Sequence, residues 1–198
     1  MEKDLPNFIG KYDNVFPDGY CDHLIEEFDR LSGIRGLMHS RQDHSNTRKH
    51  SKEDLAVELS IVAEPLKRFK EERNTHHVFY EGLQSCYDQY LREYSLVVGP
   101  LTCTNIKLQK TSPGGGYHDW HSEKSGRDPT RYLAWIIYLN SLDSDEGGET
   151  EFYYYRQRNR PIANTCLVFP SFFTHAHRGN LVLGTNAKYI ATGWFLFE

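Results

Sequence analysis

The sequence predicts an α+β fold with a mainly β core, a two-sheet β-sandwich or jelly roll in which N-terminal helices buttress one sheet. The 198-residue chain changes character near Pro100: apolar residues have helical spacing before it and form short alternating or apolar runs after it. Its length fits one domain, and no repeat or Pro/Ser-rich linker divides it. We therefore expect a single domain over residues 1–198, with a mostly helical part at 1–99 and a jelly-roll core at 100–198.

The N-terminal part is expected to contain a short strand followed by three helices. Residues 9–16 predict the strand, and residues 17–32 predict the first helix because apolar residues recur at helical spacing. Further helices are predicted at about 53–73 and 77–95, and the aromatic stripe of the last is typical of a helix packed against a sheet. Residues 33–52 are polar and aperiodic, which predicts a long mobile loop.

The C-terminal part is expected to form six strands. Each is an alternating or apolar run bounded by turn residues. The runs cover residues 104–111, 117–121, 131–140, 150–155, 162–169 and 188–197. Closely linked strands at this spacing predict two packed sheets.

Composition and charge exclude several classes of function. The 23 basic and 27 acidic residues give a net charge of -4, so we expect no dedicated nucleic-acid binding. No run approaches the roughly 20 apolar residues that span a bilayer, and the N-terminal residues carry no secretory signal or acyl anchor. We therefore expect no membrane partner and a cytoplasmic location. The four cysteines form no Cys-x-x-Cys pair and are expected to be reduced thiols.

Histidine clustering is the main functional signal. Four of the ten histidines lie in His118-Asp119-Trp120-His121-Ser122-Glu123 and in His175-Ala176-His177. Residues i and i+2 of a strand share a face, so His121 and Glu123 can reach one metal ion. A histidine from the second cluster would complete the two-histidine, one-carboxylate face of non-haem Fe(II) oxygenases. Taken alone the pattern is weak, and a structural zinc site or surface histidines without a ligand stay open as alternatives.

A lysine on the last predicted strand indicates an anion site. Alternation would place Lys188, Ile190, Thr192 and Trp194 on one face. A buried lysine needs an anion, and a dicarboxylate cosubstrate lying between Lys188 and the metal would supply one, with Thr192 offering a hydroxyl. The alternative is that Lys188 extends its ammonium to solvent.

Several segments occur in the order and spacing of a known enzyme family. They are GGYHDWHSE (115–123), GGETEF (147–152), FPS (169–171), HAHRG (175–179) and KYIATGW (188–194). Over about residues 103–196, the chain resembles the prolyl 4-hydroxylase and lysyl hydroxylase branch of the Fe(II)/2-oxoglutarate-dependent dioxygenases. The resemblance implies a double-stranded β-helix, the name given to the jelly roll in this family.

The resemblance also implies the site residues. The family's iron ligands fall on His121, Glu123 and His177, and its basic residue for 2-oxoglutarate falls on Lys188. Glu123 stands where the family usually has aspartate, although some relatives use glutamate. The family's spacing from residues 169–171 favours His175 as the distal ligand, whereas its spacing from Lys188 favours His177. Lysyl hydroxylases use the second histidine of a similar stretch, so we choose His177.

Further residues receive weaker assignments. Gln109 and Tyr117 lie on strands leading into the site and are candidates for hydrogen bonding the cosubstrate, with core packing as the alternative. His175 and Trp194 are expected behind the ligands or on the substrate side. Arg131 belongs to a group of arginines at the predicted rim that would attract a peptide or acidic substrate, or simply form a solvated face. The remaining arginines of that group are Arg127, Arg156, Arg158 and Arg160.

The implied activity is hydroxylation of an unactivated C–H bond with release of succinate and CO2. The resemblance implies Fe(II), 2-oxoglutarate and O2, with ascorbate as an optional addition, and a peptide or small-molecule substrate in which peptidyl proline is the leading expectation. Residues 33–52 and 124–130 are expected to form lids over it. The alternatives are a cupin-like metalloenzyme that does not use 2-oxoglutarate and a non-catalytic binding module on the same fold.

Overall fold

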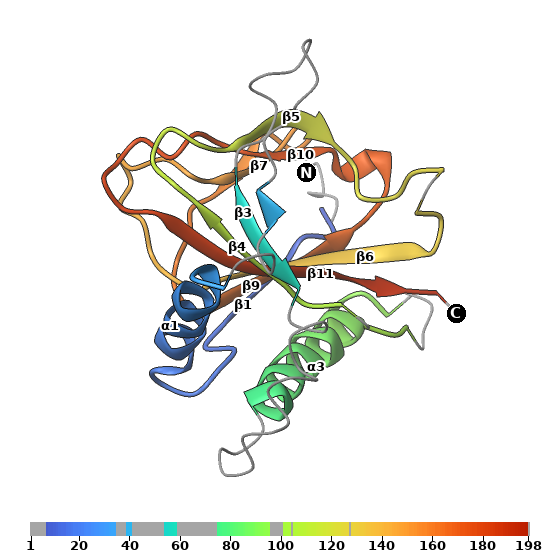
Figure 1. The fold of residues 1–198 in the computed structure, drawn as a ribbon. Helices are drawn as coiled ribbons and strands as arrows, with labels where there is room; N and C mark the ends of the chain where they lie inside the picture. Colours follow the sequence, from blue (N-terminus) through green and yellow to red (C-terminus); the bar gives the residue numbers. More distant parts are fainter. Residues whose placement is uncertain are drawn as a thin grey trace.

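Two antiparallel sheets form the centre of the computed structural model (Figure 1). The structure describes residues 7–34, 39–40, 54–58, 75–95, 101–103, 105–126 and 128–197. The larger sheet has the order β1 (Gly10–Asp13), β9 (Thr165–Pro170), β6 (Arg131–Tyr138), β11 (Lys188–Leu196), β4 (Lys107–Thr111), β3 (Leu55–Glu58) and β2 (His39–Ser40). The smaller sheet has the order β5 (Tyr117–His121), β10 (His177–Gly179), β7 (Thr150–Phe152) and β8 (Gln157–Asn159).

Strand β6, in the interior of the larger sheet, contributes side chains to two hydrophobic cores. Trp135 and Ile137 belong to the cluster that packs against the helices, whereas Ala134 and Tyr138 belong to the cluster on the other face, together with Phe152 of the smaller sheet. Successive side chains of a strand point to opposite faces, so one continuous apolar run can fill both cores. The mainly β core with two sheets agrees with the predicted fold class.

Helices α1 (Tyr20–Ser32) and α3 (Thr75–Glu93) lie on one side of the larger sheet, as predicted, and the smaller sheet lies on the other side (Figure 1). Each helix buries an apolar stripe against the sheet, with Leu24 and Phe28 on α1 and Phe79 and Leu83 on α3. This stripe follows the helical period and explains why both helices could be predicted. Of the helices that the structure describes, neither has an apolar stretch suited to crossing a bilayer.

The predicted helix over residues 53–73 is wrong in its first part. Residues 55–58 form strand β3, which pairs with β4 in the register Leu55↔Lys110 and buries Ala56 and Val57. Pairing with a neighbouring strand thus outweighs the local helical pattern. Residues 59–73 lie outside the described residues.

The predicted loop over residues 33–52 also contains a strand. His39–Ser40 forms β2, which pairs with β3, and most of the other residues of this range lie outside the described ones. Two further strands, β8 and β10, have three residues each and were not predicted, because a three-residue run is too short to show a period. The other strands after Pro100 agree with their predicted positions to within a few residues.

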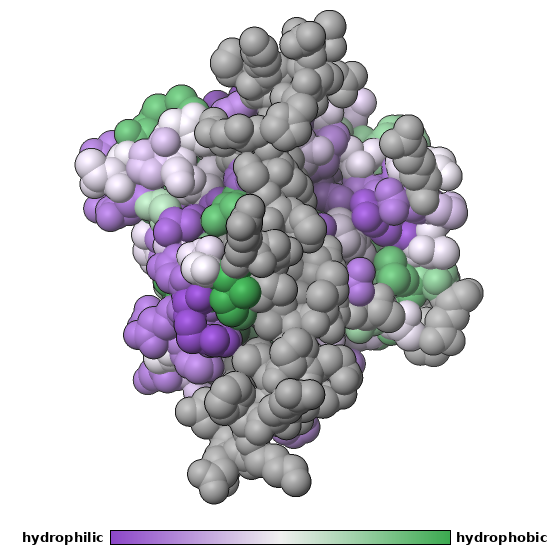
Figure 2. All heavy atoms as spheres, in the orientation of Figure 1, coloured by the Kyte–Doolittle hydropathy of each residue, from purple (hydrophilic) through white to green (hydrophobic). Residues whose placement is uncertain are grey.

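The visible surface of the described residues is mostly polar in the view of Figure 2, with smaller hydrophobic patches. All four cysteines are free thiols, and Cys21, Cys86 and Cys166 are buried.

Candidate metal centre

A cavity of about 320 Å³ opens between the two sheets. Strands β4, β5, β10 and β11 supply much of its wall. The wall includes every site residue predicted from the sequence except His175: Gln109, Tyr117, His121, Glu123, Arg131, His177, Lys188, Thr192 and Trp194. The predicted alternation on β11 is confirmed, since Lys188, Ile190, Thr192 and Trp194 all face this cavity.

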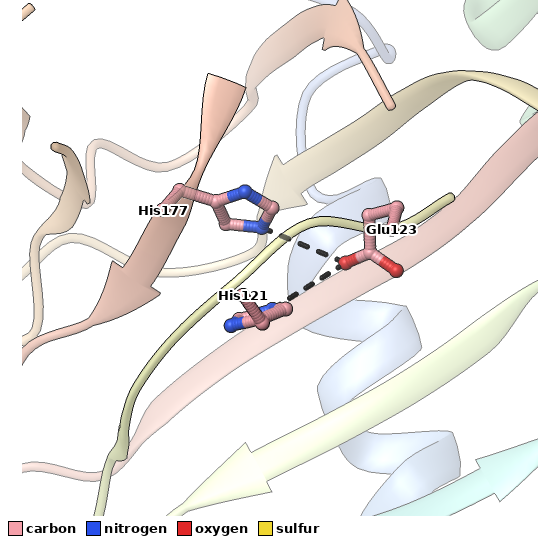
Figure 3. Close-up of side chains that lie close together, drawn as sticks. All are labelled: His121, Glu123 and His177. Carbon is pink, nitrogen blue, oxygen red and sulfur yellow. Dashed lines mark ion pairs between the residues drawn. The ribbon is translucent and has the colours of Figure 1, made fainter. Parts of the chain in front are cut away.

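His121, Glu123 and His177 meet at one point of the cavity wall (Figure 3). His121 ends β5, Glu123 follows two residues later, and His177 begins β10. The Nε2 atoms of His121 and His177 lie 3.6 Å and 3.5 Å from Oε1 of Glu123. One donor atom from each residue lies within 4.8 Å of the other two, which is close enough for a single ion to contact all three.

Backbone carbonyls orient both imidazole rings. Nδ1 of His121 lies 3.0 Å from the carbonyl oxygen of Asp119, and Nδ1 of His177 lies 3.0 Å from the carbonyl oxygen of His175. A carbonyl oxygen can only accept, so each Nδ1 donates its hydrogen, and the tautomer with hydrogen on Nδ1 presents the lone pair of Nε2 to the cavity. Metal-ligating histidines typically make this outer hydrogen bond. The three side chains therefore fit a divalent ion.

The protonation of the ligands also suits metal binding. Burial acts to raise the pKa of Glu123, but when His121 and His177 are protonated their hydrogen bonds and charges outweigh it and hold this pKa well below its usual range. Burial lowers the pKa of His121. At neutral pH the carboxylate is therefore ionised and His121 is neutral, which are the forms that bind metal, and protons compete with an ion for the same point.

Lys188 lies buried in the same cavity, only 6% exposed, so it does not extend to solvent. Its Nζ donates a hydrogen bond of 2.8 Å to the carbonyl oxygen of Gly148. Burial lowers the pKa of this ammonium to about 8. Gly148 has a φ of 73°, and a Cβ there would lie 2.8 Å from Leu142, so the turn needs glycine. The second glycine of the GGETEF segment thus positions the carbonyl that accepts the hydrogen bond from Lys188.

The second oxygen of Glu123 is held from the opposite side of the cavity. Oε2 accepts a 2.8 Å hydrogen bond from Nε1 of Trp194 and lies 3.5 Å from Nη1 of Arg131. The Arg131 guanidinium stacks on the Trp194 ring at 3.6 Å from its centroid. Thr192 Oγ1 donates to the carbonyl oxygen of Trp135, which leaves its lone pairs as acceptors.

His175 lies behind His177, but not on an extended strand. It lies in the 3-10 helix η1 (Phe173–His175), where the chain is not extended, so alternation with His177 does not apply. Its Nε2 lies 2.8 Å from the carbonyl oxygen of Asn7, and its side chain is not among the described residues lining the cavity. His175 contacts the site through its backbone carbonyl, which orients His177.

The arginines expected at the rim divide into two groups. Arg131 lines the cavity, whereas Arg156, Arg158 and Arg160 are not among its described lining residues, and Arg127 lies outside the described residues. Arg158 instead forms an ion pair with Glu151.

Four charged lining residues were not predicted from the sequence as site residues: Asp54, Lys107, Asp128 and Arg178. Alternation along β4 could have found Lys107, because it shares a face with the predicted Gln109.

Comparisons with known proteins agree with this geometry. Residues 106–196 match the model of the 2OG-Fe(II) oxygenase superfamily. A comparison with curated proteins found no sequence relative. Solved structures similar to this chain include a viral collagen prolyl hydroxylase from Paramecium Bursaria Chlorella virus-1 in complex with 2OG, with 17% identity, a TM-score of 0.65 and coverage of 94% of both chains.

Two further prolyl hydroxylases are similar in fold. The prolyl-4-hydroxylase of Pseudomonas putida has 15% identity and a TM-score of 0.68 over 96% of this chain and 92% of its own. The Trichoplax adhaerens prolyl hydroxylase, in complex with a hypoxia inducible factor peptide fragment, has 20% identity and a TM-score of 0.67 over 96% of this chain and 84% of its own. The family model thus agrees over residues 106–196 with the superfamily inferred from the sequence, and the solved structures agree with its fold.

Proposed function

We propose that this protein is an Fe(II)- and 2-oxoglutarate-dependent hydroxylase. One observation carries the proposal: two carbonyl-oriented imidazoles and a carboxylate converge in a cavity that also contains a buried lysine. Among the described residues, no carboxylate forms an ion pair with Lys188. The charges of Glu149 and Asp54 favour its ammonium, but burial outweighs them, and a bound anion would offset this burial. A cupin-like metalloenzyme without an anionic cosubstrate leaves this lysine unexplained.

Seven residues of the cavity wall have a role in this proposal. His121, Glu123 and His177 would hold Fe(II), and Lys188 would pair with the distal carboxylate of 2-oxoglutarate. Thr192, Gln109 and Tyr117 line the same cavity and would hydrogen-bond the cosubstrate.

The proposed hydroxylation also requires a site that excludes water and holds the ligand side chains in place. When bound, Fe(II) would supply the chemistry that couples decarboxylation of 2-oxoglutarate with O2 to hydroxylation of a C–H bond. Rings pack closely around the ligands: Tyr117 stacks on His121 at 3.8 Å, and Phe169 lies 4.8 Å from His177. This packing would exclude water and fix the imidazoles.

Peptidyl proline is the proposed substrate. Solved structures with this fold include a collagen prolyl hydroxylase and a prolyl hydroxylase bound to a peptide, which supports a peptide as the substrate class. These structures cover 94–96% of this chain, which supports a single dioxygenase domain over its length. The free thiols fit a reducing compartment such as the cytoplasm. Residues 124–130 follow the ligand Glu123 directly and are the proposed lid over the substrate.

An anaerobic titration tests the cofactor part of the proposal. Fe(II) and then 2-oxoglutarate are added to the metal-free protein while the weak visible charge-transfer band of a chelated 2-oxo acid is followed. We expect the band to saturate at one equivalent in the wild type and to need much more 2-oxoglutarate in Lys188→Ala. Iron binding without a band would favour a cupin-like enzyme, and no iron binding would favour a non-catalytic module.

Succinate release tests the substrate. Two peptides that differ only in a central proline or lysine are compared under identical conditions, with a third that carries alanine there as the background. We expect stimulation of succinate release by the proline peptide alone. Equal release with all three peptides would contradict a peptidyl prolyl substrate.

A further inference from the structure

Glu123 differs from a shorter aspartate ligand in the freedom of its carboxylate. A glutamate has one more rotatable bond, and a carboxylate can bind a metal ion through one oxygen or through both. If both oxygens bound, the side chain would take an additional coordination position. A site that must also admit a chelating cosubstrate and O2 needs this position to stay open.

The structure divides the two oxygens of Glu123 between different partners. Oε1 faces the Nε2 atoms of His121 and His177. Oε2 points away from that pair and accepts the hydrogen bond of the Trp194 indole at 2.8 Å. Such a bond to a charged acceptor is among the stronger hydrogen bonds in proteins. One oxygen is therefore presented to an ion, while the other is occupied.

Trp194 is itself held firmly in this orientation. It lies on β11, paired with Ala134 of β6, so its backbone belongs to the centre of the larger sheet. The Arg131 guanidinium covers its ring at 3.6 Å, and Nη2 of Arg131 forms an ion pair of 3.2 Å with Asp128. Nη1 of Arg131 also donates to the backbone carbonyl oxygen of Glu123 at 3.1 Å.

We propose that Trp194 is a positioning residue that, supported by Arg131, restricts Glu123 to binding the metal through Oε1 alone. Removing the indole N–H frees Oε2 to turn toward the ion and take a further coordination position. This inference rests on the proposed function, because it requires that the His121, Glu123 and His177 cluster binds a divalent ion. It assigns to the Trp194–Glu123 contact the task of keeping coordination positions open for cosubstrate and O2.

The number of water molecules on a bound Mn(II) ion tests this inference. Water-proton relaxation reports that number directly, and Mn(II) requires neither O2 nor turnover. Trp194→Phe keeps the ring and removes the N–H donor. We expect it to lose about one bound water and to weaken binding of 2-oxoglutarate to the Mn(II) protein by about tenfold or more, the scale of one lost hydrogen bond to a charged group.

Trp120→Phe is the matched control. Trp120 is a partly exposed residue of β5 whose ring contacts Tyr153 and Arg178 rather than Glu123. It should keep the wild-type water number. Arg131→Gln is the second variant; it should shift the water number in the same direction as Trp194→Phe, and it provides the test should Trp194→Phe not fold.

The double variant Trp194→Phe/Glu123→Asp separates positioning from general damage to the fold. The shorter aspartate draws its free oxygen away from the indole, so removing the N–H should change the water number less than it does beside Glu123. Wild-type water number and 2-oxoglutarate affinity in folded Trp194→Phe would overturn the inference while leaving the proposed function intact. A wild type that binds no Mn(II) would overturn both.

Discussion

His121 and His177 are direct cross-strand partners in the antiparallel pair of β5 and β10, with ring centroids 4.4 Å apart. Opposed residues of an antiparallel pair present their side chains on the same face. Two of the proposed ligands are thus brought together by strand pairing alone, and Glu123 needs only to turn back from the end of β5. The following predictions depend on this arrangement.

Glu123→Ala should abolish iron retention while leaving the fold largely intact. The side chain lies at a strand end and is 19% exposed, so its removal creates little cavity, but the ion loses its only anionic protein ligand among the three. Affinity for Fe(II) should fall by more than about a hundredfold, beyond the loss typical of a residue outside the coordination shell. Metal content after gel filtration and the thermal unfolding midpoint check this. Full iron content in the variant would refute the assignment of Glu123.

His175→Ala and His177→Ala should differ in kind. His177→Ala removes a ligand and should lose the metal. His175→Ala keeps the backbone carbonyl that orients His177 but leaves the carbonyl of Asn7 without its partner, which costs about 1–3 kcal/mol in free energy of unfolding. Metal content and urea unfolding of both variants distinguish these outcomes. Greater metal loss in His175→Ala would reverse the choice of the distal ligand.

Lys188→Met should abolish 2-oxoglutarate binding without destabilising the cosubstrate-free protein. Burial lowers the pKa of Lys188 from 10.5 to about 8, which corresponds to a penalty of roughly 3 kcal/mol on the charged form. Loss of the hydrogen bond to Gly148 offsets part of the gain. The unfolded lysine keeps its proton to higher pH, so wild-type stability should rise between pH 8 and 10.5, and the variant should lack this rise. Urea unfolding across this range measures it; a strongly destabilised variant at pH 7 would contradict the prediction.

The affinity for 2-oxoglutarate should fall above about pH 8. The free protein must hold Lys188 as an ammonium to pair with the carboxylate, so affinity should drop up to about tenfold per pH unit once the pH exceeds the pKa of about 8. Lys188→Arg stays charged throughout this range and is the matched control. Titrations of the Mn(II) protein at several pH values measure this. Parallel profiles for lysine and arginine would show that another group titrates.

The site residues that could be predicted from the sequence are those whose relative positions follow from the period of a single strand. His121 and Glu123 are two residues apart, and Lys188, Thr192 and Trp194 alternate along β11, so the period of a strand was enough to place them on one face. Strand β5 was predicted with its exact bounds for the same reason.

The parts that were not predictable depend on pairing between distant segments. Residues 55–58 have a local pattern typical of a helix, but they form strand β3 between β4 and β2 in the larger sheet. His175 lies in the 3-10 helix η1, and its ring donates a hydrogen bond to the carbonyl oxygen of Asn7, which is far away in the sequence. The Trp194–Glu123 contact joins β11 to the segment after β5 across the cavity, and no period along either segment encodes it.

The pairing of β5 with β10 is short, and its register shifts between His177 and Gly179. Few backbone hydrogen bonds therefore hold these two strands together. The strands are also far apart in the sequence, because β6, β7, β8 and β9 lie between His121 and His177. An ion bound to both histidines would act as a removable cross-link that closes the loop between β5 and β10, and it would stabilise only the form in which these two strands are paired. When metal binds, amide hydrogen exchange in β5 and β10 should then slow more than exchange in β6 or β9. The supply of metal would thus determine how often the pairing of β5 with β10 opens.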